Sequence, residues 1–292
     1  MRNLVLIITT LFLCGVALGQ NARDQILAAD RGFAKATAEI GLKSASLQFT
    51  SDDAIIFRPE AINAKDFWAR RNDNKTLAVR TMSAADVASS GQIGFTTGSI
   101  EYFPNGMNQP AGDFGQYVTI WGRRQNGGWR AVLELFVKHE KDLRLPIKQS
   151  INQRYSSETN KSGRSAADPS MRFLRASMSR HLGDAYKGYA AEEIRFMRDG
   201  FPPIVGRKQV IEATKDYRAV KFPFKVALME SGDMAYSWNP CEYNVSDEGM
   251  ERGNCLHVWK LRDKKWWIVL AAFARVESDL KPVLKTKTAR QK

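Results

Sequence analysis

The sequence repeats itself once, and this repeat limits the chain to two domains of one fold. The segment Ser90–Thr96 (Ser-Gly-Gln-Ile-Gly-Phe-Thr) recurs as Ser231–Ser237 (Ser-Gly-Asp-Met-Ala-Tyr-Ser). Trp129 recurs at nearly the same spacing as Trp267. A period of about 140 residues is far too long for a solenoid and matches the length of an ordinary domain. The repeat therefore indicates two whole domains.

Each copy has the same predicted order of elements: an opening helix, a short strand, a second helix and then several long strands. In the second copy, apolar residues recur every four positions, as on one face of a single helix: Leu174, Met178, Leu182 and Tyr186. The last hairpins are predicted to turn at residues 125–128 and 262–265. Helices followed by antiparallel strands are typical of the α+β fold class and not of a parallel sheet.

The composition along the chain indicates where the domains begin and end. We predict a first domain at residues 20–140 and a second at residues 171–280. Residues 141–170 have little periodicity and a segment rich in Ser, Asn and Lys, which is typical of a linker. Residues 281–292 are predicted to be a basic tail.

The first residues have the pattern of an export signal. Arg2 precedes an apolar run, Leu4–Val16, and Ala17-Leu18-Gly19 places small residues where a signal peptidase cleaves. We predict a signal peptide over residues 1–19 with cleavage near Gly19/Gln20, and hence a periplasmic or extracellular protein. No apolar run long enough to form a transmembrane segment follows.

The net charge of +13, from 44 Lys and Arg against 31 Asp and Glu, raises the question of a nucleic-acid partner. Such a partner needs the charge on one folded face. Residues 21–140 carry a net +1 and residues 171–280 a net +3, whereas the linker and the tail carry +3 and +5. Because the predicted domains are close to balanced, we predict no nucleic-acid partner.

Cys241 and Cys255 are the two cysteines outside the predicted signal peptide. In an oxidising compartment an even count favours a disulfide. With Glu248 at the midpoint of a hairpin between strands 238–243 and 254–261, the two cysteines are predicted to lie directly opposite each other, at a separation suited to a disulfide. A register shift of one residue would break this geometry. Two free, half-buried thiols are the alternative.

Three further segments give the chain a resemblance to a known family. They are Phe49–Ala54 (Phe-Thr-Ser-Asp-Asp-Ala), Gly115–Trp121 (Gly-Gln-Tyr-Val-Thr-Ile-Trp) and Gly128–Leu133 (Gly-Trp-Arg-Ala-Val-Leu). With the repeated Ser-Gly segment, their order resembles the SnoaL-like branch of the nuclear transport factor 2-like superfamily, in tandem over residues 23–140 and 171–278. The second copy departs from the pattern because Lys-Lys-Trp replaces the glycine turn.

This resemblance implies two cone-shaped domains, each a curved antiparallel sheet wrapped around N-terminal helices, with a pocket at the wide end. Members of the superfamily include ketosteroid isomerases, dehydratases and polyketide cyclases, and also secreted proteins with no known reaction. The fold therefore does not fix the function.

A Glu-Tyr pair is repeated as Glu101-Tyr102 and Glu242-Tyr243. A carboxylate in an apolar pocket can move a proton, and a tyrosine hydroxyl can stabilise an oxyanion. Adjacent residues of a strand face opposite sides, so the two members of one pair cannot act together. Glu101 and Glu242 are candidate catalytic bases, with a surface or packing role as the alternative.

Several aromatic side chains and one histidine are candidate ligand-binding residues, with a place in the core as the alternative: Trp68, Tyr117, Trp121, Trp238, His257 and Trp259. His257 shares a strand face with Cys255, and Cys241 is expected opposite, but a structural zinc ion needs four ligands and at most three are present. The sequence has no nucleotide-binding loop or metalloprotease motif. We predict no metal and no cofactor.

Three functions are compatible with the sequence, and the interior of the domains distinguishes them. Binding of a small, largely apolar molecule, which we favour, requires an aromatic pocket. An isomerase, dehydratase or cyclase requires a pocket carboxylate as general base together with a second polar donor. A structural module, in which the domains form a dimer or an internal pseudo-dimer, requires interiors filled by their own side chains.

Overall fold

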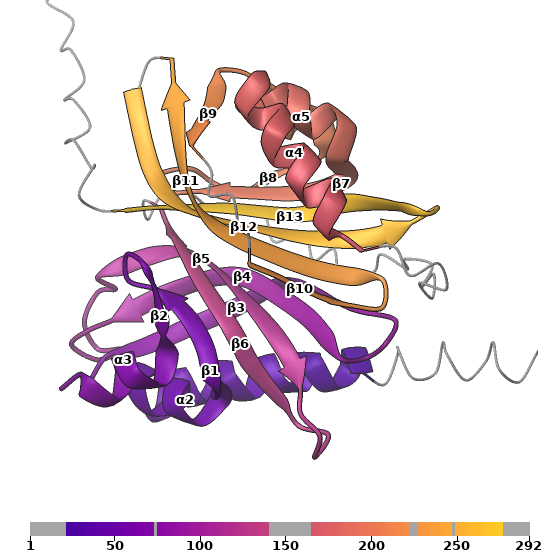
Figure 1. The fold of residues 1–292 in the computed structure, drawn as a ribbon. Coiled ribbons are helices and arrows are strands. Elements are labelled where there is room, and N and C mark those ends of the chain that lie inside the picture. The colour runs from indigo at the N-terminus through magenta and orange to yellow at the C-terminus, as the bar shows by residue number, and fades with distance from the viewer. Residues whose placement is uncertain (1–21, 73–74, 140–164, 222–226, 247–248, 277–292) are drawn as a thin grey trace, which may run out of the picture.

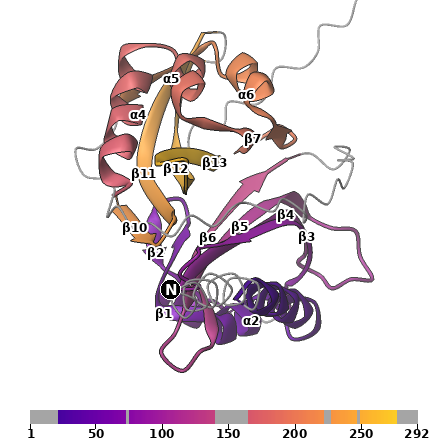
Figure 2. The ribbon, with the colours of Figure 1, turned by 90° about the vertical axis from the view of Figure 1, so that its right-hand side faces the viewer.

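The computed structural model describes residues 22–72, 75–139, 165–221, 227–246 and 249–276 (Figure 1). Two curved sheets lie face to face in the middle of the molecule, and helices cover the outer side of each sheet (Figures 1 and 2). The predicted α+β class and the tandem of two cone-shaped domains are confirmed. The predicted signal peptide and basic tail lie outside the described residues.

The first domain opens with a helix over residues 22–39. Its other elements are α2 (Leu42–Phe49), β1 (Thr50–Phe57), β2 (Ala61–Asn63), α3 (Ala64–Arg70), β3 (Leu77–Val87), β4 (Ile93–Phe103), β5 (Asp113–Arg123) and β6 (Trp129–Lys138). The strand order is β2-β1-β6-β5-β4-β3. All neighbours are antiparallel except β1 and β6, so the sheet is mixed.

The second domain has the corresponding order. Its elements are α4 (Ala167–Ser179), α5 (Leu182–Tyr189), β7 (Ala190–Arg198), β8 (Ile204–Val205), α6 (Arg207–Ala213), β9 (Tyr217–Lys221), β10 (Ala227–Ser231), β11 (Met234–Val245), β12 (Gly249–Arg262) and β13 (Lys265–Arg275). The strand order is β10-β11-β12-β13-β7-β8, and β9 also pairs with β11. Together β9 and β10 occupy the place that β3 has in the first domain, and β7 and β13 form the parallel pair.

The single helix predicted over Leu174–Tyr186 is two helices. Arg180, after α4, has an extended backbone, and α5 begins at Leu182. In the first domain the equivalent break lies at Gly41, whose φ of 90° is in the left-handed region that favours glycine. The second break, at Arg180 and His181, has no glycine, and no residue pattern indicates it. Helix α4 begins at Ala167, within the predicted linker.

The hairpin turn predicted at residues 262–265 is present between β12 and β13. Asp263 and Lys264 both have positive φ values, 48° and 62°. Two consecutive residues in the left-handed region are the type I′ geometry that matches the twist of a hairpin. The turn adopts this geometry without the Asn-Gly sequence that favours it in the first domain.

The predicted disulfide is confirmed, but the predicted register is wrong. Cys241 and Cys255 are bonded, with their Cα atoms 6.1 Å apart. In the β11–β12 ladder Cys241 pairs with Gly253, and Cys255 pairs with Asn239. The cysteines are therefore diagonal neighbours on one face of the sheet, and their Cα separation lies within the range of disulfides.

The surfaces of the two sheets that face each other form an apolar core between the domains. The first domain contributes residues of β1, β4, β5 and β6, and the second contributes residues of β7, β11, β12 and β13. At one end of this core the Ser90 and Ser231 hydroxyls lie 2.9 Å apart. These serines have equivalent positions in the two copies, and contact between equivalent residues is what a two-fold axis between domains produces.

Among the helices of the described residues, none combines the length and the apolar character that crossing a bilayer requires.

Candidate functional site

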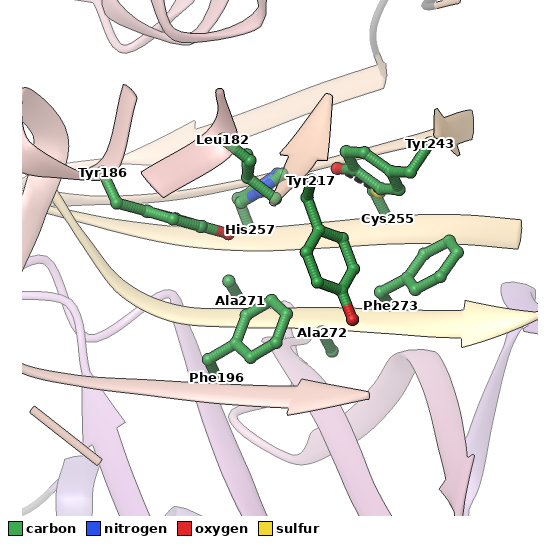
Figure 3. A pocket seen from close by; sticks show the side chains of 10 residues that line it. All are labelled: Leu182, Tyr186, Phe196, Tyr217, Tyr243, Cys255, His257, Ala271, Ala272 and Phe273. Carbon is green, nitrogen blue, oxygen red and sulfur yellow. Dashed lines mark hydrogen bonds between the residues drawn. The ribbon is translucent and has the colours of Figure 1, made fainter. Parts of the chain in front are cut away.

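A small cavity lies inside the second domain, between α5 and the concave face of the sheet (Figure 3). The residues that line it are mostly aromatic or apolar: Leu182, Tyr186, Phe196, Tyr217, Tyr243, Cys255, His257, Ala271, Ala272 and Phe273. Helix α5 presents Leu182 and Tyr186, four residues apart, on one helical face. Alternation along β12 and β13 turns His257 and Phe273 toward the same space.

The cavity is nearly filled by its own walls. Its volume is about 10 Å³, which is the space for roughly one water molecule. Aromatic rings pack edge to face around it, with centroids 5.1 Å apart for Tyr243 and Phe273 and 6.1 Å apart for Tyr217 and Tyr243. The ring of Phe173 lies 5.0 Å from that of His257. A guest larger than water would need some of these rings to move.

Three polar side chains lie in the cavity wall, and each is almost fully buried. Tyr186, Tyr217 and His257 expose 1%, 5% and 3% of their surface, and within the described part of the chain none of them makes a hydrogen bond. The neighbouring Tyr243 differs, because its hydroxyl donates to Cys255 Sγ at 3.1 Å. A water molecule or a polar ligand atom in the cavity would lie within the same wall as these three groups.

Burial keeps His257, Tyr186 and Tyr243 of the wall in their neutral forms near pH 7. Burial lowers the pKa of His257 to about 4. Burial, with a smaller contribution from Tyr243, raises the pKa of Tyr186 well above its usual value. Burial also raises the pKa of Tyr243. The lining residues include no carboxylate, so the cavity suits an uncharged molecule.

The low pKa of His257 predicts a loss of stability in mild acid. The unfolded chain takes up a proton below pH 6.5 and the folded chain only below about pH 4, so protonation favours unfolding across this window. By pH 5.5 the free energy of unfolding should fall by about 1 kcal/mol through this residue alone. Urea unfolding of the wild type and of His257→Gln at pH 7.5 and 5.5 measures the difference. The exposed His181, changed to Gln, is the control and should keep the wild-type pH dependence.

The interior of the first domain is filled by a buried charged network around Arg80. Arg80 donates to Glu134 Oε1 at 2.8 Å and to Thr119 Oγ1 at 2.6 Å. Its Nη2 atom also lies 3.7 Å from Asp30 Oδ1. The side chains of Arg80 and Asp30 are each 2% exposed. Tyr117 donates to Asp30 Oδ2 at 3.0 Å, so the second carboxylate oxygen also has a partner.

Aromatic rings enclose the guanidinium group of Arg80. It lies 4.3 Å from the ring centroid of Phe33 and 4.0 Å from that of Tyr117. Burial by itself lowers the pKa of Arg80, but the nearby carboxylates of Glu134 and Asp30 outweigh it and raise the pKa above its usual value. Arg80 therefore remains charged inside the first domain.

The candidate bases Glu101 and Glu242 lie on the faces of the sheets that point away from the domain interiors. Tyr102 packs inside the first domain, and Tyr243 lines the cavity of the second. Alternation along the strand then turns each neighbouring glutamate to the other face. Glu242 lies 3.6 Å from the Arg252 guanidinium. No carboxylate of the repeated pairs reaches the cavity.

The six candidate ligand-binding residues lie in different places. Trp68, Tyr117 and Trp121 are buried in the first domain. In the second domain His257 lines the cavity, Trp259 is buried beside it and Trp238 lies on the opposite face of the sheet against Phe57.

Tyr186, Tyr217 and Arg80 are not among the site residues predicted from the sequence. Tyr186 is predicted only as part of a helical face. A single tyrosine or arginine within a strand, such as Tyr217 or Arg80, has no sequence pattern that indicates a site. A metal site has no support in the described ranges, where no three His, Cys, Asp or Glu side chains cluster around one point.

The sequence and the structure were compared with known proteins. No protein-family model and no curated protein matches the sequence. Solved structures do match. An NTF2-like protein of unknown function from Pseudomonas putida shows 11% identity, with 37% of this chain and 86% of that chain covered and a TM-score of 0.30. A putative ketosteroid isomerase from Parabacteroides distasonis shows 13% identity, with 41% and 95% covered and a TM-score of 0.34.

A third match is an NTF2-like protein from Cytophaga hutchinsonii, with 14% identity, 37% of this chain and 93% of that chain covered, and a TM-score of 0.31. Each solved chain thus has the length of about one domain of this protein. At these identities and TM-scores the matches carry no argument about function. The strand orders and the helices on the concave faces define the class: two nuclear transport factor 2-like cone folds in tandem.

Proposed function

We propose that the second domain binds a small, uncharged, largely apolar molecule in its cavity and that the first domain is its structural partner. The observation that carries this proposal is the convergence of three buried polar side chains, Tyr186, Tyr217 and His257, on an otherwise apolar wall. One polar atom of a ligand would pair with these groups, and its apolar body would pack against the aromatic rings after some of these rings move apart.

The chemistry of the cavity supports binding better than proton transfer. A general base works best when its pKa is close to the working pH. His257 is the basic group in the wall, and its pKa of about 4 makes it a weak base at neutral pH. The carboxylates of Glu101 and Glu242 face away from the interior.

A second candidate function, an internal pseudo-dimer that serves assembly, is favoured by the apolar core between the sheets. The contact between Ser90 and Ser231 also supports it. The filled interior of the first domain fits this role. The two candidates are compatible, because one domain can be structural while the other binds a ligand.

We also propose that the protein is exported. The disulfide between Cys241 and Cys255 is typical of proteins in an oxidising compartment and so supports this proposal. It accords with the signal peptide predicted at residues 1–19.

Phenol and benzene are suitable probes, because they differ by the one hydroxyl that the cavity can pair. Phenol at ten times its dissociation constant should stabilise the mature protein by about 1.4 kcal/mol in thermal unfolding. Phenol should bind more tightly than benzene, and Tyr186→Phe should lower the phenol affinity by roughly 3- to 10-fold through loss of one hydrogen bond. Tyr236→Phe is the matched control, because Tyr236 lies in the core between the domains.

Absence of stabilisation by either probe would contradict ligand binding and leave the structural role. Equal effects of the two tyrosine variants would contradict the assignment of the site to the cavity.

A further inference from the structure

We infer that the first domain holds the cavity of the second domain in shape, and that Lys260 is a positioning residue for this cavity. The inference concerns the wall of the cavity, and its bearing on ligand binding rests on the proposed function. Three observations support it. The cavity and the domain interface share two strands. Two sets of hydrogen bonds and ion pairs, here called fastenings, hold these strands to the first domain, one set near each end.

The cavity and the interface lie back to back on β12 and β13. His257 on β12 and Phe273 on β13 face the cavity. Their neighbours Leu256 and Val258 on β12, and Leu270 on β13, face the first domain in the apolar core. A shift of either strand against the first domain therefore moves a wall of the cavity by the same amount.

The first fastening is Lys260, three positions along β12 from His257. Its ammonium group donates to Val87 O of the first domain at 2.8 Å. It also lies 3.4 Å from Asp86 Oδ2 of that domain and 3.2 Å from Asp233 Oδ2 of its own. The side chain of Lys260 is 3% exposed. One hydrogen bond and two ion pairs thus surround a buried ammonium, and they hold it in position.

Asp233 extends this fastening to the backbone of the first domain. Its Oδ1 atom accepts a hydrogen bond from Ser89 N at 2.6 Å. The carboxylate therefore links Lys260 of β12 to the turn between β3 and β4.

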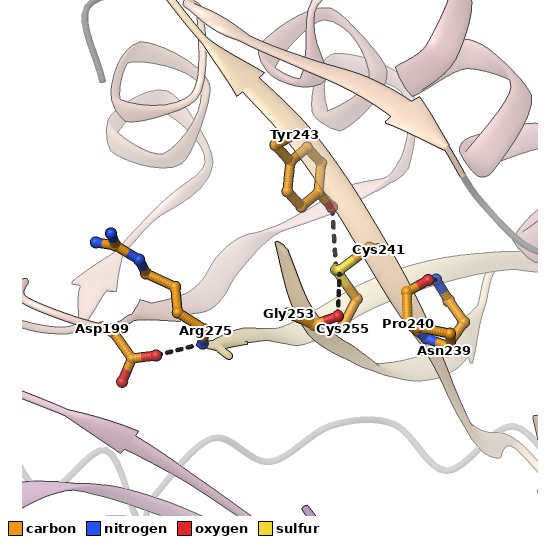
Figure 4. Close-up of a disulfide and its surroundings, with 8 residues drawn as sticks. All are labelled: Asp199, Asn239, Pro240, Cys241, Tyr243, Gly253, Cys255 and Arg275. Carbon is orange, nitrogen blue, oxygen red and sulfur yellow. Dashed lines mark hydrogen bonds between the residues drawn. A yellow bond between two sulfur atoms is a disulfide. The ribbon is translucent and has the colours of Figure 1, made fainter. Parts of the chain in front are cut away.

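The second fastening lies near the other end of the two strands. The carboxylate of Asp199 accepts hydrogen bonds from the backbone N–H groups of Arg275 on β13 and Lys138 on β6 (Figure 4 shows the bond to Arg275). Gly200 N donates to Lys138 O at 2.8 Å. On β12, Asn254 Nδ2 donates to Pro59 O of the first domain at 2.6 Å. Both strands of the wall are thus held to the first domain.

The pKa of His257 shows whether the cavity wall keeps its shape, and it can be measured without any ligand. In the closed cavity burial holds the pKa of this residue at about 4. If the wall loosens and water enters, the pKa should move toward the ordinary value of about 6.5. The titration of the His257 ring, followed by NMR in the mature protein, measures this change, and His257→Gln identifies the signal.

Lys260→Met removes the fastening and keeps an unbranched apolar stem. We expect it to raise the measured pKa of His257 by about one unit or more. Lys264→Met is the matched control in the exposed turn between β12 and β13, and it should leave the titration unchanged. Asp86→Asn, at a side chain that is 16% exposed, weakens the same fastening more gently and decides the matter if Lys260→Met does not fold.

A folded Lys260→Met or Asp86→Asn protein with the wild-type titration of His257 overturns the inference. Phenol binding to the same variants separates the two proposals. If phenol binds neither the wild type nor the variants, while the titration of His257 shifts in the variants as expected, the proposed function fails and the inference stands. If phenol binds the wild type and the titration does not shift, the inference alone fails.

Discussion

Replacement of Arg80 by methionine should lower the free energy of unfolding by about 3–5 kcal/mol, because the buried Asp30 and the partly buried Glu134 would lose their cation. Asp30 and Glu134 converge on this guanidinium group, and Asp30 is almost fully enclosed. Urea unfolding followed by tryptophan fluorescence measures the change. Arg31→Met, at an exposed position of the first helix, is the matched control and should stay within about 0.5 kcal/mol of the wild type.

The cause of the lower free energy of unfolding can be tested by removing the arginine and both carboxylate charges in one variant. If the cost comes from unpaired carboxylates, Asp30→Asn and Glu134→Gln should restore much of the stability that Arg80→Met removes. A triple variant as unstable as Arg80→Met alone would contradict this. The cost would then come from the lost packing of Arg80 between Phe33 and Tyr117.

Loss of the disulfide should be the second large effect. The cysteines are separated by 14 residues, and a disulfide that closes a loop of this length stabilises a protein by about 3 kcal/mol. We expect Cys241→Ala with Cys255→Ala to lower the free energy of unfolding by this amount. Both sulfurs are buried, so the wild type should react with a thiol reagent only after reduction and unfolding.

A reductant provides the control for the disulfide variant. It should lower the melting temperature of the wild type and leave that of the double alanine variant unchanged. Labelling of two thiols in the unreduced, unfolded wild type would contradict the disulfide and support the free thiols that the sequence left as an alternative.

The local features of the fold could be predicted from the sequence. The turn at residues 262–265 and the α+β order followed from patterns within a few residues of one another. The pairing of Cys241 with Cys255 was also predicted, because it depends only on their shared hairpin. The register was not, because alternation in a strand pair fixes which face a residue occupies but not which partner lies opposite.

The cavity could be predicted only in part, for a physical reason. His257 was a candidate because it alternates with Cys255 on one strand. Tyr186 and Tyr217 come from a helix and a distant edge strand, and only the folded chain brings them to the same space. The charged interior of the first domain was missed for the same reason, since Asp30 and Arg80 belong to elements far apart in the sequence.

The direct contact of Ser90 with Ser231 places the two halves in the relation that identical subunits have in a symmetric dimer. In a dimer of identical chains, every substitution changes both partners at once. Within a single chain each half mutates alone. One interior can therefore hold a buried arginine with its carboxylates while the other has an uncharged wall, although both halves contribute to the same apolar core.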